Sequence, residues 1–88
     1  MKKLKFDKNN CRMHNDTVVI SLQPKMFSYI VKMYENKGFD VKTSKQLCEI
    51  LPYNTKINKK FAESGFPFRI VKDGKLKTNS LTYFLKEV

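Results

Sequence analysis

The stretch that decides the fold is residues 43–65, which read TSKQLCEILPYNTKINKKFAESG. Ser44 is placed to cap a short helix, because its hydroxyl can accept a hydrogen bond from an unpaired N–H of the first turn. The apolar side chains of this segment share one helical face, where a buried thiol is common: Leu47, Cys48, Ile50 and Leu51. Pro52 stops the helix because proline cannot continue the backbone hydrogen bonding. We therefore predict a helix of about two turns before Pro52.

A second short helix is predicted directly after the Pro-Tyr turn. Asn54 is the capping residue of this segment. Ile57 and Phe61 lie four residues apart and point inward, while the lysines between them stay on the outside. Gly65 ends the helix in the left-handed conformation that glycine adopts without strain. The stretch thus predicts two short helices on either side of a tight turn.

Downstream of Gly65 the helical periodicity is lost. Residues 66–71 and 76–78 predict two strands of a β-hairpin, because Asp73-Gly74 between them supplies the residue types that tight hairpin turns prefer. Asn79 or Ser80 is then placed to cap a last helical turn or two after residue 80. Three apolar residues of this last helix can close the core: Leu81, Phe84 and Leu85.

Upstream, residues 1–16 show no period and predict a partly ordered arm that leads to a strand over residues 18–22. Residues 24–37 then show the clearest helical pattern, with Pro24 at the first position and Gly38 just past the end. A wide apolar stripe runs along one side of this helix: Met26, Phe27, Ile30, Val31, Met33 and Tyr34. Two interpretations stay open, an intramolecular core and a protein interface.

Length and charge bound the function. The 88 residues allow one domain, with the arm, strand and amphipathic helix in residues 1–41 and the remaining elements in residues 42–88. The chain has 18 Lys and Arg against 8 Asp and Glu, a formal charge of +10, and each half carries +5. A polyanionic partner is the first expectation, although a positive balance also serves solubility alone.

Part of the chain resembles a known family. Residues 43–51 are similar to its first helix, Gly65-Phe66-Pro67-Phe68 stands where the family has Gly-Leu-Pro, and Asn79-Ser80-Leu81 with Tyr83-Phe84-Leu85 stands where it has its closing motif. On these motifs, residues 42–87 resemble the MerR-like and excisionase family of small winged helix-turn-helix DNA-binding domains. The resemblance implies a winged helix-turn-helix with a two-stranded hairpin wing. Together with the strand and helix expected upstream, it predicts an α+β, mainly helical fold with an extra N-terminal strand and helix.

The resemblance also implies a DNA-binding surface. The second short helix would present its polar face to a major groove: Asn54, Thr55, Lys56, Asn58, Lys59 and Lys60. Asn58 is the best base-reading candidate, because an asparagine amide can pair with an adenine edge. The hairpin would hold phosphates with Arg69, Lys72, Lys75 and Lys77.

Catalytic and metal chemistry have little support in the sequence. Cys11 and His14 have the spacing of metal ligands, but Cys48 is the one further cysteine and His14 is the single histidine. We expect no metal, no cofactor and no enzyme activity. The basic start is followed by residues 6–10, which are too polar for a secretory signal, and two cysteines suit a reducing compartment. We expect a cytoplasmic protein without a membrane span.

Three functions follow from these observations. The first is a small DNA-binding protein, either a transcription regulator or an excision-type architectural factor of a mobile genetic element, with duplex favoured and single strands possible. The second is a replication or recombination accessory that binds DNA and docks a larger protein through the stripe Met26, Phe27, Ile30, Met33 and Tyr34. That stripe would also serve a homodimer. The third is a protein-only interaction module.

Overall fold

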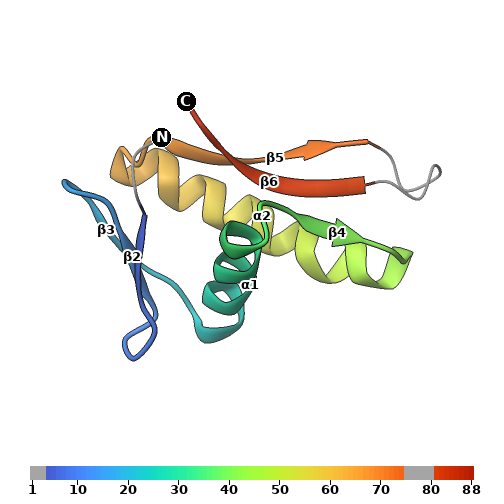
Figure 1. Ribbon diagram of the computed structural model, residues 1–88, viewed down its shortest axis with the longest axis horizontal. Coiled ribbons are helices and arrows are strands. Elements are labelled where there is room, and N and C mark those ends of the chain that lie inside the picture. Colours follow the sequence, from blue (N-terminus) through green and yellow to red (C-terminus); the bar gives the residue numbers. More distant parts are fainter. Residues whose placement is uncertain (1–3, 75–80) are drawn as a thin grey trace.

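The computed structural model describes residues 4–74 and 81–88. Within these residues it contains two helices and two three-stranded antiparallel sheets (Figure 1). The predicted α+β class is therefore confirmed. The expectation of a mainly helical chain is wrong, because helices α1 (Pro24–Glu35) and α2 (Ser44–Ser64) hold only 12 and 21 of the 79 residues that the structure describes.

An N-terminal sheet replaces most of the partly ordered arm that the sequence predicts. Its antiparallel strands pair in chain order: β1 (Lys5–Asp7), β2 (Arg12–His14) and β3 (Val19–Ser21). The predicted strand at residues 18–22 is confirmed as β3. Two side chains hold the turns, because the Asp7 carboxylate and Asn15 Oδ1 each accept hydrogen bonds from backbone N–H groups two and three residues later. This turn chemistry is the local signal that the sequence analysis missed.

Helix α1 begins as predicted, with Pro24 in its first turn. At its end the left-handed residue is Lys37, with φ of 57°, and the prediction that Gly38 holds this position is wrong. The Gly38 N–H instead donates to the Met33 carbonyl at 2.8 Å and closes the helix one residue later. Glycine is needed at position 38 because its φ is 152° and because a Cβ there would lie 2.9 Å from Thr82 Cγ2.

Helix α2 is one continuous helix, so the predicted pair of short helices is wrong. Pro52 lies inside it. A single buried face runs past the proline without interruption: Ile50, Asn54, Ile57 and Phe61. Pro52 itself is on the exposed side, and one turn further on the Thr55 hydroxyl donates to the Leu51 carbonyl at 3.1 Å. Packing of the continuous inner face outweighs the local cost of the proline.

The ends of α2 follow the expected chemistry more closely. The N-cap is Thr43, one residue before the predicted Ser44, and its hydroxyl accepts from the Gln46 N–H at 3.1 Å. Gly65 takes the left-handed conformation with φ of 68° and the Phe66 N–H donates to the Phe61 carbonyl. The prediction that Gly65 ends the helix is confirmed.

The C-terminal sheet holds three antiparallel strands in the order β4-β6-β5. Their bounds are β4 (Phe39–Val41), β5 (Phe68–Asp73) and β6 (Leu81–Glu87). Strand β5 confirms most of the first predicted hairpin strand. The predicted last helix is wrong, because residues 81–87 form the central strand, which exchanges hydrogen bonds with a neighbour on each side. The second predicted hairpin strand, residues 76–78, lies outside the described residues.

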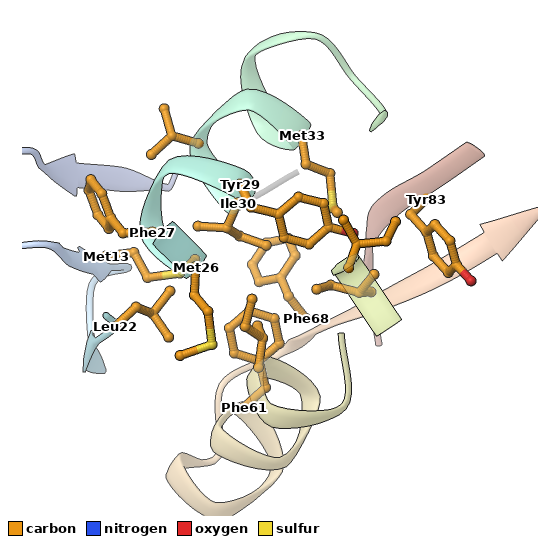
Figure 2. Close-up of a cluster of buried hydrophobic side chains, with 14 of the residues drawn as sticks. Met13, Leu22, Met26, Phe27, Tyr29, Ile30, Met33, Phe61, Phe68 and Tyr83 are labelled. Atoms are coloured by element: carbon orange, nitrogen blue, oxygen red, sulfur yellow. The ribbon is translucent and has the colours of Figure 1, made fainter. Parts of the chain in front are cut away.

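The core joins both sheets through α1. One cluster of buried side chains includes Met13 of β2, Ile30 of α1, Phe61 of α2 and Phe68 of β5 (Figure 2). Each of these four side chains is fully or almost fully excluded from solvent. Burial of a side chain of this size stabilises the fold by about 1.5–3 kcal/mol.

The apolar stripe of α1 is used inside the chain. Four of the five residues predicted as a protein interface are buried in the core: Met26, Phe27, Ile30 and Met33. The fifth, Tyr34, is half-buried, with its ring 5.3 Å from that of Phe6. The interpretation of this stripe as an exposed docking surface is therefore wrong. An accessory subunit or a homodimer would need another surface.

Candidate nucleic-acid interface

The outer face of α2 carries exposed lysines. Because the buried residues of α2 define its inner side, Lys56 and Lys59 lie on the opposite side, and both are exposed as predicted. Within residues 4–74 and 81–88, neither makes a hydrogen bond or an ion pair. Glu63 lies on the same face, one turn after Lys59, and is the one acidic residue of this half of the helix. The ammonium groups of Lys56 and Lys59 are thus exposed to solvent.

Lys60 is also exposed, but its ammonium group has a partner. Lys60 Nζ donates to the carbonyl oxygen of Ser21, at the end of β3. This contact joins α2 to the N-terminal sheet across 39 residues of sequence. A charged donor can hold such a carbonyl and still meet an anion with its remaining N–H groups, because an ammonium group has three.

Asn58 does not face solvent as a base-reading residue would. Its Nδ2 donates to the Ile70 carbonyl at 3.1 Å, and its Oδ1 accepts from the Ile70 N–H at 2.7 Å. The side chain is half-buried between α2 and β5. Its amide pairs with the outward-facing backbone groups of the edge strand β5, as a neighbouring strand would. The prediction that Asn58 is available to read bases is wrong.

Asn54 is buried and not part of an exposed face. It retains 7% of its accessible surface, and its Oδ1 accepts a hydrogen bond from the Tyr29 hydroxyl at 2.6 Å. Burial raises the pKa of Tyr29 well above its ordinary value, so the hydroxyl stays protonated and remains a donor. The Asn54 Nδ2 group has no partner among the described residues. Asn54 therefore links α1 to α2, and its predicted place on the DNA-binding face is wrong.

Of the remaining predicted residues, two make hydrogen bonds within the fold, one is an exposed cation and two lie outside the described residues. Arg69 is half-buried, and its guanidinium donates to the carbonyl oxygens of Phe66 at 2.9 Å and Phe68 at 2.6 Å. Thr55 is exposed, with its hydroxyl on the backbone of its own helix. Lys72 is exposed on β5, two residues beyond Ile70. Lys75 and Lys77 lie outside the described residues.

The exposed cations are poorly neutralised. Within the described part of the chain there is one ion pair, between Lys8 Nζ and Glu35 Oε2 at 3.9 Å, and both side chains are exposed. The formal net charge of +10, which already counts every carboxylate, gives the surface a positive potential. Lysines in this state can contact phosphate oxygens, whereas Asn54 is buried and both amide atoms of Asn58 are hydrogen-bonded within the fold.

The other candidate groups do not gather into a site. Among residues 4–74 and 81–88 no group of three or more metal-binding side chains comes together. Both cysteines are free thiols, and Cys48 is exposed on α2, in contrast to the buried position that the sequence predicts. Neither of the two described helices is long and apolar enough to cross a membrane.

Contacts between residues far apart in the sequence explain why Lys60 and Asn58 differ from their predicted roles. Ser21 and Ile70, the backbone partners of Lys60 and Asn58, lie 39 and 12 residues away in the sequence. No local pattern indicates such partners.

Comparison with protein-family models found no matching family, and comparisons with curated proteins and with solved structures found no match.

Proposed function

We propose that this chain is a small DNA-binding protein that contacts the phosphate backbone through the outer face of α2. The observation that carries the proposal is the exposed, unneutralised state of Lys56 and Lys59 in a chain with a formal charge of +10. Contacts of this kind release counterions from DNA, which provides affinity in any sequence.

Strand β5 extends the proposed contact beyond the helix. Asn58 joins α2 to β5 at Ile70, and Lys72 follows two residues later, about 6–7 Å further along the strand. Lys72 is exposed and lies on the strand that leads into the segment between β5 and β6. A basic helix beside a basic hairpin is the arrangement that the winged-helix resemblance implies, and it supports contact with a duplex at two places.

A DNA-binding protein of this kind can be a transcription regulator or an architectural factor. The geometry fits an architectural factor better than a sequence-specific regulator. Asn54 is buried, and both the nitrogen and the oxygen of the Asn58 amide are hydrogen-bonded to Ile70. The Arg69 guanidinium donates to two carbonyl groups. The exposed side chains of this surface are mainly lysines, which hold phosphates in any sequence. We expect discrimination between duplexes to come from DNA shape and deformability.

The test is fluorescence anisotropy with a labelled AT-rich duplex, a GC-rich duplex of equal length and the matching single strand, each across a salt series. For four to six neutralised phosphates, the log of the association constant should fall against log salt with a slope of about −4 to −5 for a duplex. We expect the two duplexes to give the same salt slope, and any difference in affinity between them to follow their shape and deformability. A preference for the single strand would favour a replication accessory, and no binding at low salt would refute the proposal.

A pair of variants tests the surface rather than the net charge. The double variant Lys56→Glu/Lys59→Glu should weaken duplex binding about tenfold or more and make the salt slope shallower by about two. The control Lys25→Glu/Lys32→Glu makes the same charge change on exposed residues of α1. Equal losses in the two variants would show that binding follows net charge alone and would contradict the assignment to α2.

A further inference from the structure

The free edge of β3 faces α2. Two hydrogen bonds flank β3: the Leu22 N–H donates to the Cys11 carbonyl, and the Asn15 N–H donates to the Val18 carbonyl. Every second residue from 18 to 22 therefore turns its backbone groups toward β2. Ser21 lies between these positions, and its backbone carbonyl points away from β2. That carbonyl accepts the hydrogen bond from Lys60 Nζ. The Lys60 ammonium group is therefore held at the boundary between α2 and the N-terminal sheet.

Arg12 lies on β2, beside Ser21 and on the side of β3 that faces away from α2. It is the register partner of Ser21 in β2. In an antiparallel pair that is not directly hydrogen-bonded, the two Cα atoms are about 4.5 Å apart and their side chains lie on the same face. The next residue, Met13, is fully buried, so Arg12 projects from the opposite, outer face of the sheet, where it is exposed. The Arg12 guanidinium has no ion-pair partner within 4.0 Å among the described residues.

We infer that Arg12 and the α2 lysines form one DNA-contacting surface, so that the bound phosphates follow a path from α2 across β3 to the outer face of the N-terminal sheet. This inference rests on the proposed function and adds a second element to the surface. Arginine suits the outer end of such a path because its planar guanidinium can hold a phosphate with two parallel hydrogen bonds.

The local charge balance favours a phosphate at this position. The surface has five cations: Lys5, Arg12, Lys56, Lys59 and Lys60. It has two carboxylates, Asp7 opposite Arg12 in the sheet and Glu63 on α2. Asp7 stays negative and attracts Arg12, its register partner, while its carboxylate oxygens accept hydrogen bonds from Asn9 and Asn10. Lys5, Arg12 and Asp7 together still carry a charge of +1. A net positive charge therefore remains on both sides of β3.

The test compares three single variants in the duplex salt series. Arg12→Gln should make the slope shallower by about one, because one phosphate contact is lost. Arg12→Lys should keep the slope, because the charge is retained. Lys25→Gln, at an exposed position of α1, should also keep it. Thermal unfolding checks that each variant folds, and we expect no large change because all three replacements are at exposed positions.

The outcomes separate this inference from the proposed function. If the unchanged protein binds with a steep slope and Arg12→Gln leaves that slope intact, the inference is overturned while DNA binding stands. A slope that falls equally for Arg12→Gln and Lys25→Gln also overturns it. If the unchanged protein does not bind any probe, the proposed function itself fails.

Discussion

Helices α1 and α2 differ in how much of each the fold uses. Six of the 12 residues of α1 are buried, against four of the 21 residues of α2. Helix α1 contacts both sheets, since Phe27 packs on Phe6 of β1 and Tyr29 packs on Phe39 of β4. Helix α2 keeps a long outer face in solvent. The more apolar helix is therefore the structural centre, and the longer basic helix leaves most of its residues outside the core.

The largest effect should come from a truncation in α1. Ile30 has no exposed surface, so Ile30→Ala should lower the free energy of unfolding by about 2–5 kcal/mol, measured by urea denaturation. Leu51→Ala on α2 is the control, because Leu51 is 44% exposed, and it should change stability by less than about 0.5–1 kcal/mol. Equal losses of unfolding free energy in the two variants would contradict the view that α1 contributes more to the core than the outer side of α2.

The next effect tests the continuity of α2. Pro52→Ala should raise the free energy of unfolding by about 1–3 kcal/mol, because alanine restores the N–H that Pro52 lacks and removes the ring from a helix interior. Thermal denaturation followed by circular dichroism measures the change. A loss of stability in this variant would instead indicate that residues 52–53 form a turn between two helices, as the sequence predicts.

A smaller loss of stability, in Asn58→Ala, tests whether Asn58 stabilises the fold or contacts DNA bases. Asn58→Ala should cost about 1–2 kcal/mol of stability, because the N–H and carbonyl groups of Ile70 lose their partners. The salt slope of DNA binding should not change, since no charge is removed. Thr55→Ala, on the exposed side of the same helix, is the control and should change stability by at most about 0.5 kcal/mol. A changed preference between the AT-rich and GC-rich duplexes in Asn58→Ala would restore the base-reading role.

Elements with strong local signals were predicted well. Pro24 and the apolar period of the following residues predicted α1, and Gly65 predicted the end of α2. The exposed positions of Lys56 and Lys59 also follow from helical period alone. In each case the deciding interactions lie within about one helical turn, which is the range over which a sequence pattern is informative.

Elements whose partners are distant were predicted poorly. Residues 81–87 have enough apolar side chains for a short helix, but β4 and β5 offer backbone groups on both sides, and these make the segment a strand. Asn54 and Asn58 have the residue type of a base-reading surface, but Asn54 is buried against Tyr29 and both amide atoms of Asn58 bond the Ile70 backbone. The sequence pattern for an exposed amide and for a buried amide is the same.

The sequence by itself determined the charge, the single small core, the start of α1 and the end of α2, because these depend on composition and on neighbours in the chain. Only the tertiary structure decided that α2 continues through Pro52, and that the apolar stripe of α1 is core and not interface. It also decided which polar side chains remain outside. Helix propensities differ by tenths of a kcal/mol and a proline costs about 3 kcal/mol, whereas the packing of several buried side chains contributes more than either.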